Sequence, residues 1–155
     1  MSRTDQIVHQ SAMLFYQKGF QATSMREIAS RLDIKAASLY NHISGKEELL
    51  AKIIMRLAHE FVDHIQQTAS ENSYAVNQLE AIIQHHILIN IHKYESLAIL
   101  NNEWIYLADT DKQTFIQLRT AYEDHLRDII HTGIKHQVIK NMNPDIIIFS
   151  MLSSL

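Results

Sequence analysis

Between residues 35 and 41 the chain carries small side chains next to one amide and one cation. If this segment is helical, its outward face would let the backbone approach the edges of DNA base pairs. Alanine and serine can contact a thymine methyl group, and an asparagine can form two hydrogen bonds with an adenine. The candidate base-reading residues are Lys35, Ala36, Ala37, Ser38 and Asn41.

Residues around this segment could bind the phosphate backbone of DNA. Tyr40 and His42 would flank the same face, and side chains of this kind hydrogen-bond to phosphate oxygens. Lys46 lies in the first turn of the next predicted helix, and Thr23 and Ser24 lie at the start of the preceding one. The free N–H groups at a helix N-terminus favour anions. These positions therefore predict that the two helix starts bind DNA phosphates, although the segment carries little net charge.

Two short helices and a tight turn must position these residues. Ser24 with Glu27 forms a predicted capping box, which starts a helix whose apolar residues recur at helical spacing. Asp33 falls where the chain has to turn, since aspartate tolerates the left-handed conformation better than most residues. Ser44 with Glu47 predicts a second capping box and a long fourth helix. This order is typical of helix-turn-helix proteins.

One stretch resembles the DNA-binding domain of TetR family transcriptional regulators: TSMREIASRLDIKAASLYNHISGKEELL, residues 23–50. The similarity includes IVHQSAMLFYQKGF, residues 7–20, and extends over about residues 3–63. It implies a three-helix DNA-binding head followed by a helical body that binds a ligand and dimerises. It also implies DNA contacts by Thr23, Ser24, Lys35, Ala36, Ala37, Tyr40, His42 and Lys46.

Three positions depart from the family pattern. Asp33 replaces the usual turn glycine, and Ala37 replaces a frequent glycine. Lys35 stands where a capping serine or threonine is common, so a cation replaces a helix cap.

Several of these residues also have an interpretation without DNA. Tyr40 could belong to the edge of the core, since Leu39 lies beside it. His42 could be a solvent-exposed residue stabilised by the helix dipole, and Lys46 could be an exposed charge. The sequence leaves these alternatives open.

Composition indicates an all-α protein. Three glycines and one proline leave little material for β-turns. There is no cysteine for a disulfide, no run of about 18 apolar residues to span a membrane and no apolar leader, so we expect a cytoplasmic protein without membrane contact. Residues 1–46 carry six Lys and Arg against three Asp and Glu, which gives a net charge of +3. Because the whole chain has a net charge of −3, the remaining residues carry −6. This asymmetry favours contact of the first part alone with a polyanion.

We expect a DNA-binding head at residues 1–46 and an effector-binding, dimerising body at residues 47–155. Thr110 with Gln113 forms a third predicted capping box, which starts the seventh helix. Predicted helices five to seven of the body are apolar with isolated polar residues, as in a ligand pocket between bundle helices. The spacing loosely resembles family members that sense fatty acyl or acyl-CoA compounds, so the expected effector is largely apolar. Any single one of these residues could equally be ordinary core. The candidate ligand-binding residues are His86, Asn90, Glu103, Trp104, Phe115, Leu118, Tyr122 and His125.

The last predicted helix begins at Asn143-Pro144-Asp145 and reads IIIFSMLSSL. It is too apolar to lie against solvent alone. In related regulators the last two helices form the dimer interface, so we expect a homodimer. We also expect the chain to stop within the first of those helices, as a C-terminally truncated fragment would.

The favoured interpretation is a repressor that leaves double-stranded operator DNA when a small molecule binds. Two other classes stay open. One is a helical protein-interaction module without DNA binding, and the other is a metal-binding protein that uses His85, His86 and His92 or His59 and His64. No HExxH motif, Ser-His-Asp order or Gly-rich phosphate loop is present, so we expect no catalysis, metal or cofactor.

Overall fold

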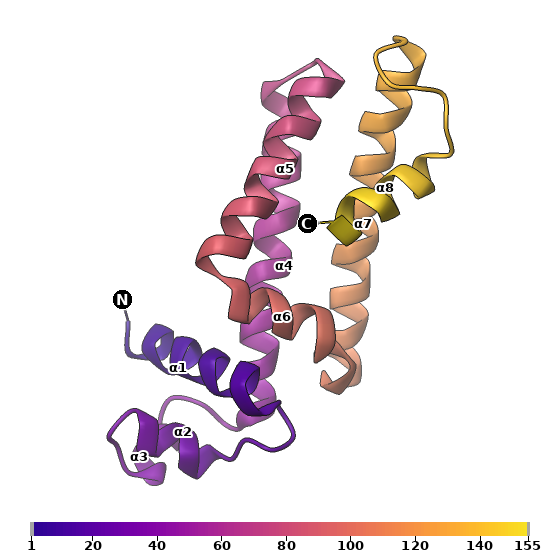
Figure 1. Ribbon diagram of the computed structural model, residues 1–155. Helices are drawn as coiled ribbons and strands as arrows, with labels where there is room; N and C mark the ends of the chain where they lie inside the picture. Colours follow the sequence, from indigo (N-terminus) through magenta and orange to yellow (C-terminus); the bar gives the residue numbers. More distant parts are fainter. Residues whose placement is uncertain (1, 155) are drawn as a thin grey trace. The chain divides into compact units, whose positions relative to one another are not determined.

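The computed structural model describes residues 2–154, and all regular secondary structure within that range is helical (Figure 1). The predicted all-α class is therefore confirmed. The elements in chain order are α1 (Arg3–Lys18), α2 (Met25–Arg31), α3 (Ala36–Tyr40), α4 (Lys46–Glu71), α5 (Ala75–His92), α6 (Tyr94–Asn102), the 3-10 turn η1 (Trp104–Tyr106), α7 (Asp109–Lys135) and α8 (Pro144–Ser154).

Capping side chains explain where several of these helices begin. Ser2 and Asp5 form a capping box at the start of α1, with the Asp5 N–H donating to the Ser2 hydroxyl at 3.1 Å. Ser24 and Glu27 form the predicted capping box of α2. At α8, the Asn143 side-chain oxygen accepts from the Asp145 N–H at 2.9 Å, as the Asn-Pro-Asp start predicts.

Two predicted caps are wrong. Ser44 forms its hydrogen bonds with Glu48 instead of Glu47, through its N–H and its hydroxyl at 2.8 and 2.7 Å. Thr110 does not cap α7, because that helix already begins at Asp109 and the Thr110 carbonyl accepts from Thr114 within it. Both errors are shifts of one residue at a helix start, where sequence patterns specify the boundary least well.

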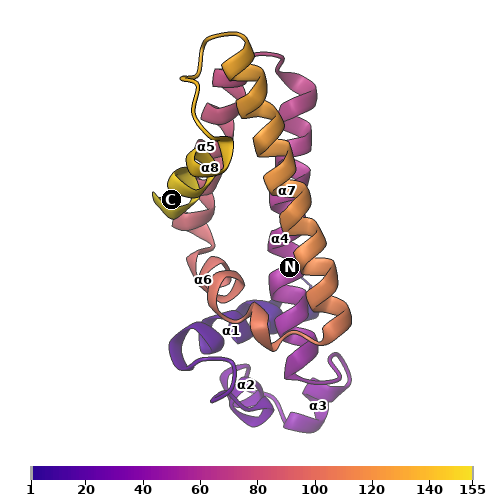
Figure 2. The ribbon, with the colours of Figure 1, turned by 90° about the vertical axis from the view of Figure 1, so that its right-hand side faces the viewer.

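The chain packs into two compact units, and each unit is made of two segments that are separated in the sequence. Unit 1 contains the residues up to Leu57 and Tyr94–Phe115, so α6 and η1 pack with the first helices. Within it, α6 lies against α1 (Figure 2). Tyr16 of α1 meets Tyr94 of α6 edge to face at 5.0 Å. The core of unit 1 is made of apolar side chains that are essentially inaccessible, including Ile7, Phe15, Ile28, Leu39, Leu49 and Ile99.

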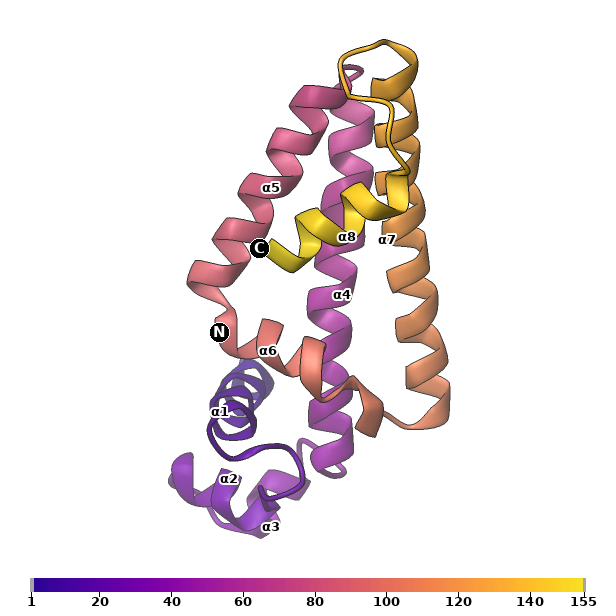
Figure 3. The same ribbon diagram turned by 45° about the vertical axis from the view of Figure 1, so that its right-hand side comes forward.

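Unit 2 contains Ala58–Lys93 and the residues from Ile116 onward. The second part of α4, α5 and the larger part of α7 run side by side in it (Figure 3). An ion pair between Arg127 and Asp145, 2.9 Å long, joins α7 to the first turn of α8. The fully buried residues of this unit include Ile65, Ile82, Leu126 and Ile130.

Among residues 2–154, no helix combines the length and the apolar character that crossing a membrane would need. The predicted functional division at residue 46 stays a prediction. The packing adds that residues 94–115, which that division assigns to the body, belong to the same compact unit as the first three helices.

Candidate nucleic-acid interface

The turn between α2 and α3 is built as the sequence predicts. Asp33 adopts a positive φ of 54°, and the Ile34 N–H returns to the Ala29 carbonyl at 3.0 Å. Lys35 then precedes α3 in an extended conformation without a side-chain cap. Leu39 and Ile43 are buried at 0% and 2% exposure and anchor α3 to the core of unit 1.

The opposite face of α3 is open to solvent. Tyr40 is 54% exposed, so the alternative that it belongs to the core edge is wrong. Ala36 is half-buried at the start of the helix. Ala37 and Ser38 are small and exposed, so the edge of a DNA groove could approach the backbone closely at these positions. The exposed members of the predicted set on α3 and immediately beside it are Lys35, Ala37, Ser38, Tyr40, Asn41 and His42.

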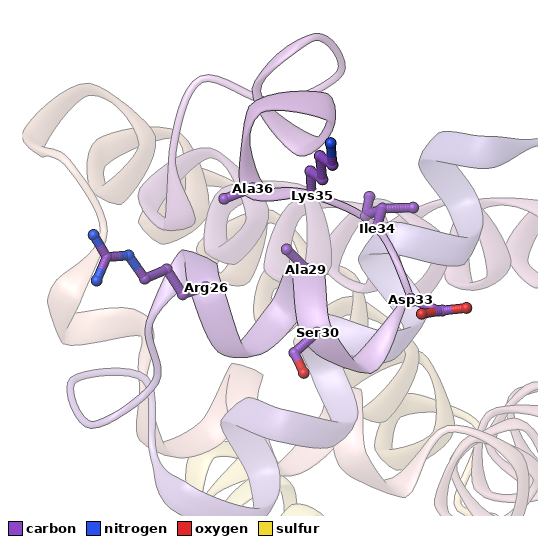
Figure 4. Close-up of a pocket in the computed structure, with 7 residues that line it drawn as sticks. All are labelled: Arg26, Ala29, Ser30, Asp33, Ile34, Lys35 and Ala36. Carbon is purple, nitrogen blue, oxygen red and sulfur yellow. The ribbon is translucent and has the colours of Figure 1, made fainter.

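An open cleft of about 560 Å³ follows the turn from α2 to the start of α3. Arg26 and Asp33 lie at its two ends with side chains pointing away from each other, and Lys35 extends beside α3 (Figure 4). The Lys35 ammonium forms no ion pair or hydrogen bond with another residue of the described range 2–154, so it remains available to an anion. The residues that line this cleft are Arg26, Ala29, Ser30, Asp33, Ile34, Lys35 and Ala36.

The start of α2 differs from the expected anion site. Thr23 is buried at 2% exposure, and its hydroxyl donates to the Gly19 carbonyl at 2.9 Å, so this hydroxyl does not lie on the exposed face. Ser24 is exposed, but the Glu27 carboxylate already accepts from its N–H at 2.8 Å. Hydrogen bonds from Lys18 first, and then from Ser24, lower the pKa of Glu27 to about 2. The carboxylate of Glu27 therefore occupies the N-terminus of α2, where the sequence predicts that a DNA phosphate binds.

The start of α4 is arranged in the same way. Glu48 accepts from Ser44, and these hydrogen bonds hold its pKa below the usual range. Lys46 is turned inward: its ammonium donates to the carbonyls of Phe20, Gln21 and Thr23 at 3.1, 3.2 and 3.3 Å. The same nitrogen lies 4.5 Å from the centre of the Phe20 ring. Sequence reasoning missed these contacts, because residues more than twenty positions apart make them.

Unit 2 brings two predicted ligand residues together. His86 and Tyr122 share a hydrogen bond of 2.7 Å between the imidazole Nε2 and the phenol oxygen. The His86 ring stacks on Phe61 at 4.7 Å. Burial lowers the pKa of His86 to about 4 and raises that of Tyr122, so both groups are neutral near pH 7. Of the other predicted residues in this unit, Leu118 and His125 are half-buried and Asn90 is exposed.

The remaining members of that set lie in unit 1. Trp104 packs on Phe115 with ring centroids 5.7 Å apart. The Glu103 carboxylate accepts from the Phe20 N–H at 3.4 Å. The predicted ligand residues thus divide between the two units, and their assignment to a ligand stays a prediction.

The observed pair of neighbouring histidines combines one residue from each of the two sets considered for a metal site. His64 and His85 stack face to face with their centroids 3.9 Å apart, and Glu60 lies 3.9 Å from His85. Burial is the main cause that lowers the pKa of both rings, that of His85 to about 4. Within the described residues no three His, Asp or Glu side chains are arranged to hold a metal ion.

Comparison with known proteins places this arrangement in a family. A model described as bacterial regulatory proteins, tetR family, matches residues 7–53, and one described as tetracyclin repressor-like, C-terminal domain, matches residues 72–155. The chain belongs to the TetR family of bacterial regulatory proteins. The first match covers α1, α2, α3 and the first turns of α4, so the resemblance carried by the helix-turn-helix motif is confirmed.

Individual TetR family members share modest sequence identity with the chain. The transcriptional repressor KstR2 of Mycolicibacterium smegmatis is 23% identical over 134 residues, which are 86% of this chain and 65% of that repressor. The chain thus spans slightly less than two thirds of that relative.

Solved structures share the fold. The ketosteroid regulator KstR2 of Mycobacterium tuberculosis superposes with a TM-score of 0.93 at 18% identity, over 99% of this chain and 79% of that one. The regulator AibR, in complex with isovaleryl coenzyme A and operator DNA, gives 0.87 at 25% identity, over 98% and 83%.

Proposed function

We propose that the protein is a transcriptional regulator of the repressor type, which binds operator DNA as a homodimer and leaves it when a small molecule binds. The observation that carries this proposal is the solvent-exposed α3, whose buried side is fixed by Leu39 and Ile43. Its outward side offers small residues, one amide and the exposed cation of Lys35. This combination suits direct reading of a major groove.

The homodimer is part of this proposal. Symmetric helix-turn-helix dimers place two recognition helices about 34–36 Å apart, so that each reads one half of a palindromic site. The strongly exposed Phe149 and Ile146 on α8, at 74% and 55%, favour an interface formed by that helix.

The effector is proposed to be largely apolar with a neutral polar group. The neutral His86–Tyr122 pair beside Phe61 could orient a carbonyl or hydroxyl without requiring a charge. AibR has been solved with isovaleryl coenzyme A, which supports an acyl thioester as the first candidate. An allosteric coupling of about 1–3 kcal/mol would change DNA affinity roughly 5–150-fold.

The direct test is binding to the DNA that flanks the protein's own gene, measured by gel shift with and without acyl-CoA thioesters. The Asn41→Ala variant should lose about 1–3 kcal/mol of preference for the specific duplex over a random one. Asn77→Ala is the matched control, because Asn77 is an exposed amide on α5 in unit 2. Equal binding of the wild-type chain to specific and random duplexes would instead favour a protein-interaction module.

A further inference from the structure

The loop between α1 and α2 is held from two sides at Phe20. The Phe20 N–H donates to the Glu103 carboxylate at 3.4 Å, and its carbonyl accepts from the Lys46 ammonium at 3.1 Å. An anion thus faces the donor and a cation faces the acceptor of the same residue. All three residues lie in unit 1.

The Phe20 side chain reinforces this arrangement. Its ring is buried, meets Phe15 edge to face at 5.3 Å and stacks on Tyr106 at 5.8 Å. The Lys46 ammonium lies over the same ring at 4.5 Å, which is within the range of a cation–π contact. Phe20 therefore links α1, η1 and the first turn of α4.

Lys46 has no donor left over in this arrangement. An ammonium group has three N–H donors, and the three carbonyls of Phe20, Gln21 and Thr23 accept all of them. To bind a phosphate, Lys46 would have to give up at least one carbonyl and leave the ring. Lys35 differs, because its exposed ammonium has no such competing partners among residues 2–154.

The held loop leads directly into the DNA-facing part of the unit. Thr23 donates its N–H to the Phe20 carbonyl at 3.3 Å, and Ser24 then caps α2. A shift of this loop would move α2 and, through the turn at Asp33, α3. The three carbonyls bound by Lys46 therefore set where the N-terminus of α2 lies.

We propose that Lys46 is a positioning residue of the DNA-binding unit, which fixes the loop of residues 19–24 with Glu103 on its other side, and that it is not a phosphate ligand. This inference rests on the proposed function and revises the role expected for Lys46 from sequence. Lys35 keeps the role of phosphate or base contact.

The experiment compares Lys46→Met with Lys35→Met, which remove the same charge at two places. Fluorescence anisotropy with a labelled duplex gives the affinity over a range of salt concentrations. Each lost phosphate contact reduces the steepness of log K against log salt by about 0.9. Lys35→Met should show that change. Lys46→Met should bind roughly tenfold more weakly with the wild-type slope, a loss equivalent to about 1.4 kcal/mol.

Hydrogen exchange on the free protein gives a readout that needs no DNA. Lys46→Met should speed exchange of the Thr23 amide roughly tenfold through easier local opening, and Glu103→Gln should act in the same direction. Lys35→Met should leave this amide unchanged.

Two results overturn the inference: a salt slope that falls in Lys46→Met as it does in Lys35→Met, or unchanged affinity and exchange in Lys46→Met. If the wild-type chain binds no DNA while Lys46→Met still speeds exchange, the clamp on the loop stands and the proposed function is the part that fails.

Discussion

The hydrogen bond between His86 and Tyr122 allows a quantitative prediction about unit 2. Tyr122→Phe removes only the hydroxyl, from a side chain that is 9% exposed, and keeps the ring that meets Phe61 at 5.8 Å. The 2.7 Å bond is then lost, and the His86 nitrogen loses this partner in a largely buried setting. An unsatisfied buried polar group costs about 1–3 kcal/mol. We expect the free energy of unfolding to fall by that amount at pH 7.

The same pair predicts how stability depends on pH. The pKa of His86 is about 4 in the folded chain, below the ordinary 6.5, chiefly because of burial. The unfolded chain therefore takes up a proton at this residue as pH falls below 6.5, while the folded chain does so only near 4. Stability is lost between these values, by up to about 3 kcal/mol at 1.36 kcal/mol for each pH unit. His64 and His85 act in the same direction.

Urea unfolding followed by circular dichroism at pH 7 and pH 5 measures both effects. Tyr74→Phe is the matched control, because Tyr74 is 48% exposed and its change should stay within about 0.5 kcal/mol. His86→Gln should lose part of the wild-type dependence on pH. The reasoning is refuted if Tyr122→Phe is as stable as Tyr74→Phe, or if His86→Gln keeps the full loss of stability towards pH 5.

Three further predictions concern the turn, a cap and the last helix. Asp33→Gly should raise thermal stability by up to about 1 kcal/mol, because the φ of 54° strains a side chain; Asp33→Asn, which keeps the side chain, should not. Ser24→Ala should cost about 1 kcal/mol in urea unfolding, and Ser70→Ala, away from any helix start, should cost less. Phe149→Glu should give a monomer in light scattering where Asn77→Glu leaves a dimer; a dimer in both would remove α8 from the interface.

Features decided within a few residues could be predicted from the sequence. The capping box of Ser24 and Glu27 needs only residues that are three positions apart, and so does the start of α8 at Asn143. Asp33 suits the turn because aspartate tolerates the positive φ found there. Leu39 in α3 and Ile43 just after that helix are four positions apart, and this helical spacing indicates burial on the same side.

Contacts between distant segments could not be predicted in this way. The inward turn of Lys46 depends on carbonyls more than twenty residues earlier, and the bond from Phe20 to Glu103 spans 83 positions. The stack of His64 on His85 requires the packing of α4 against α5. No periodicity within one helix contains this information, because these contacts are set by the packing of whole helices.

Hydroxyl-radical footprinting on the DNA that flanks the protein's gene tests the central claim most directly. The account predicts two protected half-sites of related, inverted sequence whose centres lie one helical turn, about 10–10.5 base pairs, or a multiple of it apart. Protection should weaken in Asn41→Ala and persist in Asn77→Ala. Protection without this spacing, or without dependence on Asn41, would contradict the claim that the exposed face of α3 reads DNA.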